Sequence, residues 1–133
     1  MTRTNLSTHG PFERSVGFSR AVVVEHAGLR RVFVAGTAAI GDDGETVAPN
    51  DAYEQAAYIF RKLAPVLAEA GRTMADVVRT RMYLTDIADQ DAVGRAHGEV
   101  FRDVCPAATM IGGVTLVRPE LVVEIELEAV RGE

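Results

Sequence analysis

The chain has 133 residues, of which 47% are hydrophobic and 25% charged, and these totals are typical of one globular domain rather than of a disordered or fibrous protein. The formal net charge of −5 argues against a nucleic-acid or anionic-lipid partner, because such partners are bound by clustered Lys and Arg. The single cysteine, Cys105, excludes an intrachain disulfide, and residues 1–15 contain no apolar run long enough for a signal peptide or a membrane span. We therefore expect a cytoplasmic protein with no membrane association.

The amino-terminal third predicts an arm followed by a hairpin. Residues 1–15 are polar and rich in Thr and Ser, which indicates a mobile or edge-lying arm ahead of a single domain over residues 16–133. Residues 18–25 and 30–38 are rich in β-branched and aromatic side chains, and a glycine-containing turn, His26-Ala27-Gly28, lies between them. This pattern predicts an antiparallel hairpin over residues 18–38, and the fold is expected to begin near Val16.

A loop and a long helix are predicted next. Residues 40–50 contain Asp-Asp-Gly and Pro-Asn, both of which favour turns, with a short strand near Thr46-Val47. Asn50 or Asp51 can cap a helix over residues 51–70, where apolar side chains recur at helical spacing.

The next segment alternates in a way that predicts a strand over residues 76–86. One set of side chains on this strand is expected to face the core (Val78, Thr80, Met82 and Leu84), and the other set is more polar (Arg79, Arg81 and Tyr83). A second helix follows Asp89, because four apolar residues recur at helical spacing (Val93, Ala96, Val100 and Phe101). Cys105-Pro106 ends it, and we expect Cys105 to be a buried or partly exposed structural thiol.

Two further strands, at residues 109–116 and 121–130, complete the order ββ(β)αβαββ, which places two helices on one face of a mixed sheet. In the last strand, three glutamates alternate with three apolar residues (Glu124, Glu126 and Glu128 with Val123, Ile125 and Leu127). If the apolar set packs under the helices, the carboxylates lie on the uncovered face, near Arg79 and Arg81. That face is either solvated or a subunit interface with paired charges.

Four segments together resemble the Rid (reactive intermediate deaminase) family, also known as the endoribonuclease or liver perchloric-acid-soluble protein family. They are VGFSRAV at residues 16–22, VFVAGT at 32–37, DVVRTRMYLTDI at 76–87, and PAAT with LVRPELVVEIELEAV at 106–130. The resemblance implies an α+β, chorismate-mutase-like fold with a mixed, mainly antiparallel sheet. It also implies a homotrimer in which the sheets form a central barrel and small-molecule pockets lie between subunits.

In that family, deaminases hydrolyse imines and enamines with a pocket arginine that holds the substrate carboxylate and a glutamate that positions water. The resemblance implies that the glutamate is Glu124 and that the arginine position is Ala108. Because alanine offers none of the hydrogen bonds of a guanidinium, we expect typical 2-iminoacids to be held poorly. The remaining expected substrate-binding positions are Phe18, Arg20, Gly36, Thr37, Thr109 and Met110. Either Arg20 or Arg118 is a candidate to replace the missing cation, if its side chain swings into the pocket.

Two roles remain possible for each of Glu124 and His97. Glu124 is either a water-positioning base or an interfacial salt-bridge partner. His97 is either a proton shuttle or a helix residue with a structural hydrogen bond. His9 and His26 lie in the arm and the turn without metal-ligand spacing, so we expect neither a metal nor another cofactor. Gly112-Gly113 is expected to mark a bulge or a close backbone approach beside the pocket.

Three functions follow from these observations. The first is hydrolysis of an imine, enamine or related reactive metabolite, with Glu124 directing water. The second is a non-catalytic trimer that binds a small metabolite, which the replacement by Ala108 favours. The third is ribonuclease activity, and the acidic balance of the chain argues against it.

Overall fold

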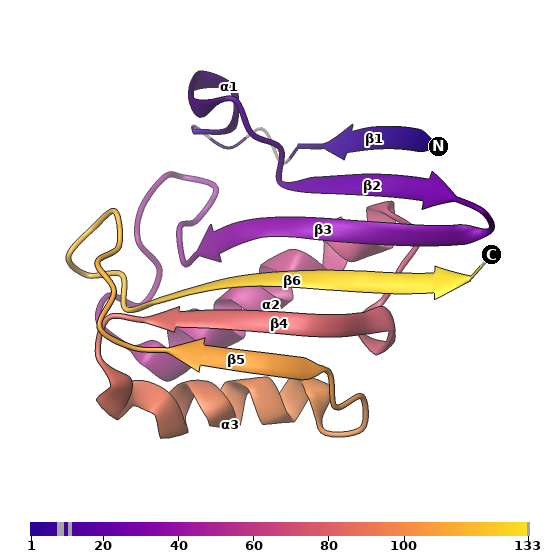
Figure 1. Ribbon diagram of the computed structural model, residues 1–133. Coiled ribbons are helices and arrows are strands. Elements are labelled where there is room, and N and C mark those ends of the chain that lie inside the picture. Colours follow the sequence, from indigo (N-terminus) through magenta and orange to yellow (C-terminus); the bar gives the residue numbers. More distant parts are fainter. Residues whose placement is uncertain (8–9, 11, 133) are drawn as a thin grey trace.

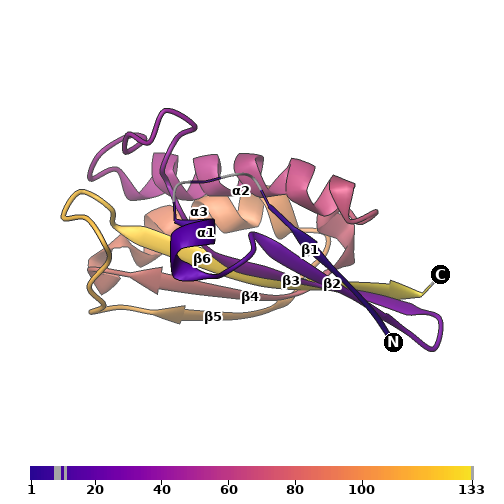
Figure 2. The same ribbon diagram turned by 90° about the horizontal axis from the view of Figure 1, so that it is seen from above.

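The computed structural model describes residues 1–7, 10 and 12–132. Its strands form a single six-stranded sheet. Figures 1 and 2 show that the two long helices cover one face of this sheet and leave the other face open. The strand order is β1-β2-β3-β6-β4-β5, and only β4 and β5 are parallel among these neighbours. The strands are β1 (Thr2–Leu6), β2 (Ala21–His26), β3 (Leu29–Ala38), β4 (Val77–Leu84), β5 (Ala107–Ile111) and β6 (Val123–Gly132). The predicted mixed, mainly antiparallel sheet with two helices on one face is confirmed.

The helices are α1 (Glu13–Val16), α2 (Ala52–Glu69) and α3 (Gln90–Phe101), with two single 3-10 turns, η1 (Met74–Asp76) and η2 (Ile87–Asp89). Asp51 caps α2 as predicted, because its carboxylate accepts a hydrogen bond from the backbone N–H of Glu54 at 3.0 Å. In the described part of the chain, no helix is both long and apolar enough to cross a membrane.

The hairpin of β2 and β3 is confirmed, and its turn consists of Ala27 and Gly28. Both residues have positive φ angles, 52° and 80°, which is the geometry that suits the right-handed twist of two hydrogen-bonded strands. The short strand expected near Thr46 is reduced to an isolated bridge between Ile40 and Thr46.

The sheet begins at Thr2, ahead of Val16, where the fold was expected to begin. Residues 2–6 form β1, which pairs with the outer edge of β2. An edge strand with solvent on both sides tolerates polar side chains, and this one buries only Leu6. The arm expected over residues 1–15 therefore includes an edge strand, and α1 begins within it. His9 lies outside the described residues.

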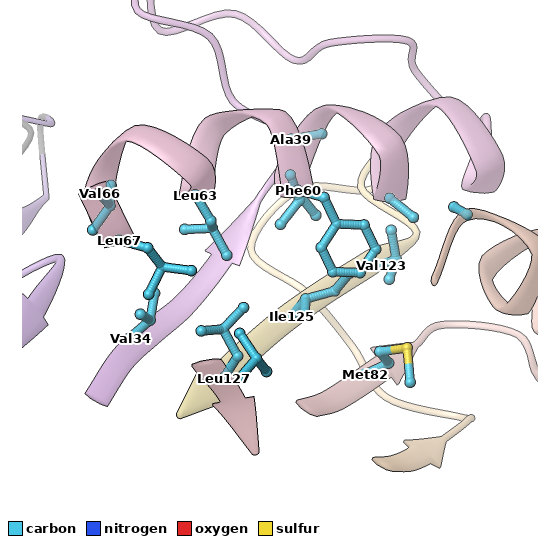
Figure 3. Packing of buried hydrophobic residues seen from close by; sticks show 14 of the residues in the cluster. Val34, Ala39, Phe60, Leu63, Val66, Leu67, Met82, Val123, Ile125 and Leu127 are labelled. Carbon is cyan, nitrogen blue, oxygen red and sulfur yellow. The ribbon is translucent and has the colours of Figure 1, made fainter. Parts of the chain in front are cut away.

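The core lies between α2 and the face of the sheet that the helices cover. Figure 3 shows Phe60, Leu63 and Leu67 of α2 pointing toward strand residues that include Val34, Ile125 and Leu127. Leu63 and Leu67 have no exposed surface. This burial removes apolar area from water on both elements and holds the end of β3 under α2.

Val78 of β4 lies on the face opposite to the predicted one. Val78, expected in the core, is 45% exposed, and Val77 is buried instead. The pairing with β6 shifts between Val77 and Arg79, and such a bulge reverses the alternation of side chains ahead of it. From Thr80 onward the predicted alternation is confirmed, with Thr80, Met82 and Leu84 buried.

The connection after α3 also departs from expectation. Val93, Ala96 and Phe101 are buried as predicted, but Cys105 is exposed. Its φ of 52° places it in a turn outside the core, where its thiol lies 3.2 Å from the carbonyl oxygen of Arg102. Gly112 makes the expected close approach, since a Cβ there would lie 2.6 Å from the Cβ of Ile87.

Candidate functional site

The uncovered sheet face carries paired charges. Val123, Ile125 and Leu127 are buried under the helices, so the alternating glutamates of β6 lie on the opposite face. Arg81 Nη1 lies 3.2 Å from Glu128 and 3.9 Å from Glu126, and the hydroxyl of Tyr83 donates a hydrogen bond to Glu126. The predicted grouping of β4 and β6 charges on this face is confirmed.

Glu124 lies at the end of this face, where β6 begins and β3 ends. It pairs in register with Ala38 on β3 and with Tyr83 on β4. Its carboxylate lies against the backbone of Gly36, since a Cβ at Gly36 would be 2.9 Å from Oε2 of Glu124. The β3 register shifts between Val34 and Thr37, and this irregularity positions Gly36 to face the carboxylate.

Burial raises the pKa of the Glu124 carboxyl, and nearby Glu126 acts in the same direction while Arg20 opposes it. In the described residues, no side chain donates a hydrogen bond to this carboxylate. A carboxyl of this kind is poised to accept a proton from a bound water and to return it.

Around Glu124 and Gly36 lies a hollow of about 360 Å³, here called the glutamate hollow. Its remaining lining consists of Tyr83 and Glu126 from the open face and of three residues from the loop before β6 (Val114, Thr115 and Leu116). Figure 1 shows this loop at the end of the sheet where β3 ends. The hollow is wide enough for a small metabolite and a water molecule.

Arg20 lies behind Gly36 and is only 9% exposed. Its Nη1 donates hydrogen bonds to the carbonyl oxygen of Gly36 at 3.0 Å and to Oγ1 of Thr37 at 2.7 Å, and its guanidinium lies 5.4 Å from the centre of the Phe18 ring. Burial lowers the pKa of Arg20, while Glu13 and Glu124 oppose the shift. The structure thus brings together five predicted positions, namely Phe18, Arg20, Gly36, Thr37 and Glu124.

Three other predicted positions lie on β5, at the far edge of the sheet. Ala108, Thr109 and Met110 pair in register with residues 80–82 of β4, so the whole of β4 separates them from β6. Ala108 and Thr109 are exposed. Within one chain, these residues are not brought to Glu124.

Arg118 and His97 are both held away from the glutamate hollow. Arg118 donates to Oγ1 of Thr46 at 3.2 Å, and the Thr46 hydroxyl donates to Glu120 at 2.7 Å, which lowers the pKa of the Glu120 carboxyl. His97 lies under the sheet on the helix side, where its Nε2 is 2.9 Å from Oγ1 of Thr80. Burial lowers the pKa of His97.

Sequence reasoning missed two charged residues near this site. Glu13 is only 4% exposed and accepts hydrogen bonds from the backbone N–H groups of Gly10 and Arg20. Nothing in the polar segment around Glu13 signals its burial. Lys62 had a signal, since it is the only lysine among the 14 Lys and Arg residues. In the described residues, no three side chains of the metal-binding types gather in a metal site.

The comparisons with known proteins agree with this fold. The family model described as Endoribonuclease L-PSP matches residues 11–131. The chain is 41% identical over 125 residues to the uncharacterized protein SCO2049 of Streptomyces coelicolor, covering 92% of this chain and 87% of that protein. It is 29% identical over 94 residues to the 3-aminoacrylate deaminase RutC of Acinetobacter baylyi, covering 71% and 74% respectively.

Among solved structures, the chain is similar to Rv2704 of Mycobacterium tuberculosis, which is described as a member of the highly conserved YjgF/YER057c/UK114 family. The TM-score is 0.81 at 39% identity, and the match covers 96% of this chain and 98% of that one. The chain therefore belongs to the Endoribonuclease L-PSP family, the Rid family that its own sequence motifs resemble.

Proposed function

We propose that this protein hydrolyses a small imine, enamine or related reactive metabolite in pockets between the subunits of a homotrimer. The observation that carries the proposal is the Glu124 carboxylate. It is half-buried against the backbone of Gly36, has a raised pKa and faces the glutamate hollow. A structural salt-bridge partner would be expected to touch its cation, as Glu128 touches Arg81 at 3.2 Å.

In the reaction, Glu124 accepts a proton from a water molecule as the water oxygen forms a bond to the carbon of the C=N group. An enamine first takes a proton on carbon and so reaches the same iminium form. The resulting carbinolamine takes the proton from Glu124 on nitrogen. The C–N bond then breaks to release ammonia while the hydroxyl group gives its own proton to the Glu124 carboxylate, which leaves a carbonyl product. A pKa raised by burial suits both transfers, since the carboxyl must accept and return one proton.

In a trimer, the β5 residues of one subunit would lie near the Glu124 of a neighbouring subunit, which a single chain keeps apart. The open face exposes Phe33 by 38% and Ile111 by 45%, and a second subunit against this face would bury both. The strand β5, with Ala108, Thr109 and Met110, forms a free edge of the sheet. In the proposed assembly this edge faces the glutamate hollow of a neighbouring subunit.

Substrate choice follows from Ala108. A methyl group offers no hydrogen bond to a carboxylate, so we propose that typical 2-iminoacids are poor substrates. The named activity of the relative RutC, deamination of 3-aminoacrylate, supports an enamine as the chemical class.

The test is ammonia release from freshly generated imines and enamines by the wild-type protein and by Glu124→Gln. Loss of the carboxylate base should lower the rate by about 100-fold or more, as is usual for a general base. Glu128→Gln is the matched control, because Glu128 lies on the same strand and the same face but pairs with Arg81. Equal rates for wild type and Glu124→Gln would refute the role of Glu124.

A second candidate, binding of a metabolite without turnover, is favoured by the same Ala108. A thermal-shift screen separates the two, because a ligand that binds only the native state raises the melting temperature. Recovery of a tight ligand chemically unchanged, with no ammonia release from any imine, would favour binding.

A further inference from the structure

A second pocket lies behind the glutamate hollow, on the helix side of the end of β3. It has a volume of about 240 Å³ and is here called the lysine pocket. Its apolar walls include Phe12, Phe18 and Ile40, and its charged lining is Glu13, Arg20, Asp42 and Lys62. It is therefore a partly apolar pocket with a few convergent charged groups, which is the usual make-up of a small-molecule site.

Lys62 is the only lysine in a chain that contains thirteen arginines. It lies on α2, and its Nζ donates a hydrogen bond to the carbonyl oxygen of Ile40 at 2.9 Å. An arginine at this position would supply a hydrogen-bond donor and a positive charge equally well. Neither the hydrogen bond nor the charge therefore explains why position 62 is a lysine. What distinguishes an amine is that it can lose its proton and act as a nucleophile, whereas a guanidinium stays charged.

The surroundings favour the neutral amine. Burial lowers the pKa of Lys62 and the positive charge of Arg20 adds to the shift, while Asp42 and Glu13 oppose it. An adjoining hollow brings Tyr58, Arg61 and Glu69, from the same helix, near the outer side of the lysine. Desolvation beside a second cation is a known way to activate a lysine.

Arg20 offers a partner for a carboxylate in the same pocket. In the described residues, the side-chain hydrogen bonds of Arg20 use Nη1 alone, and its buried Nε has no partner. A guanidinium with free donors binds a carboxylate well, because the two planar groups match.

We propose that the lysine pocket is a second ligand site, in which Lys62 forms a reversible Schiff base with a small 2-oxo acid whose carboxylate is held by Arg20. The lone pair of Nζ forms a bond to the carbonyl carbon, and the carbonyl oxygen takes the proton that the nitrogen loses, which gives a neutral carbinolamine. That hydroxyl leaves as water with one further proton, and the nitrogen keeps the positive charge of the iminium. The proposal does not depend on hydrolysis at Glu124.

Trapping with pyruvate and sodium cyanoborohydride tests the site, with mass spectrometry of the intact chain and of its peptides. The chain has one lysine, so a reduced adduct falls either on Lys62 or on the amino terminus, and peptide mapping separates the two. We expect one adduct, on Lys62, already formed near neutral pH. Butanone, which lacks the carboxylate, should label severalfold more slowly.

The matched control moves the lysine by one residue, in the double variant Arg61→Lys/Lys62→Arg. Arg61 is exposed, and an arginine at position 62 keeps a donor for Ile40. In this variant, labelling of the lysine should fall severalfold near neutral pH and recover only as the pH approaches the ordinary lysine pKa of about 10.4.

Three results would overturn the proposal. Equal labelling rates in the wild type and the relocated variant would mean that Lys62 is not activated, as would an adduct confined to the amino terminus. Labelling by butanone as fast as by pyruvate would remove the role of Arg20. Trapping on Lys62 that persists in Glu124→Gln would support a site separate from the hydrolase, whatever the ammonia assay shows.

Discussion

The most specific single-residue feature is the contact between Gly36 and Glu124. The backbone of Gly36 has no positive φ that would demand glycine, so its role is to leave room for the carboxylate. The carboxylate of Glu124 can lie against this backbone only because residue 36 has no Cβ. The position of the proposed base is therefore sensitive to a very small change.

Gly36→Ala should displace the Glu124 carboxylate, because the new Cβ would lie 2.9 Å from Oε2. The flexible glutamate can move aside, so we expect a loss of stability below about 1 kcal/mol. Misplacement of a reacting group lowers ammonia release by about 10- to 100-fold. Gly98→Ala, on α3, is the control: its Cβ would meet only Arg102 at 3.8 Å, and it should leave activity unchanged. Unchanged activity in Gly36→Ala would contradict the proposed geometry.

Ala108→Arg should raise kcat/KM for 2-iminoacids. A charge-assisted hydrogen bond to a substrate carboxylate contributes about 1.5–3 kcal/mol, which corresponds to about 10- to 100-fold. Ala108 is exposed on β5, so the larger side chain needs no rearrangement of the core. Ala107→Arg adds the same charge one residue away and should have a much smaller effect. Robust turnover of 2-iminoacids by the wild type would show that Ala108 does not limit the substrate range.

His97 should make stability depend on pH. Its pKa is lowered in the folded state by burial, so the unfolded chain binds the proton more readily. Stability is then full above the unfolded pKa of about 6.5 and falls as the pH drops through and below that value. Urea unfolding of His97→Gln, which keeps a group able to bond Thr80, should show a smaller loss over this range. An identical pH dependence in both proteins would assign the loss to other groups.

At the scale of elements, α2 connects the core to the site. Its inner face packs on β3 and β6, as Figure 3 shows, and its outer flank carries Lys62 to the end of β3. The amino end of α2 is also tied to the chain before β6, because the Gln55 side chain bonds the backbone of Ala48, Glu120 and Val122. The start of this helix therefore supports the loops beside the glutamate hollow.

Asp51→Ala removes the cap of α2 and should cost about 1 kcal/mol of unfolding free energy, because the N–H of Glu54 loses its acceptor. Asp51→Asn keeps a side-chain acceptor and should cost much less. Urea denaturation monitored by circular dichroism measures both. If the two variants were equally destabilised, the charge on Asp51, and not its hydrogen bond, would be what stabilises the helix.

At the scale of the whole molecule, the two faces of the sheet differ in what covers them. The helices cover one face (Figure 2). The other face carries charged pairs and exposes Phe33 and Ile111. A sheet with such a free face favours self-association.

We predict a trimer, with a mass in solution three times the chain mass of 14.3 kDa. Phe33→Glu would set a carboxylate beside Glu128, its neighbour on β6, and should dissociate the assembly by like-charge repulsion. Arg61→Glu changes the charge on the helix side and should leave the mass unchanged. Analytical ultracentrifugation measures all three proteins. A wild-type monomer would rule out a pocket shared between subunits.

Much of this architecture was predictable because its signals are local. The period-two alternation of residues 123–128 and the helical spacing of residues 52–69 each reflect one element facing one core, and both were assigned correctly. The motifs around Glu124 likewise indicated the family without any coordinates. Val78 was misassigned because a bulge depends on how β4 pairs with β6, which the β4 sequence does not encode by itself.

The sequence by itself determined the order of the main elements from β2 to β6, the hydrophobic face of the sheet and the family, since short-range periodicity and ordered motifs carry that information. Only the tertiary structure decided that Glu13, Arg20 and Lys62 line one pocket, and that Gly36 leaves room for Glu124. Those contacts join residues far apart in the chain, and they depend on strand register and on where α2 crosses the end of β3. No local pattern specifies either.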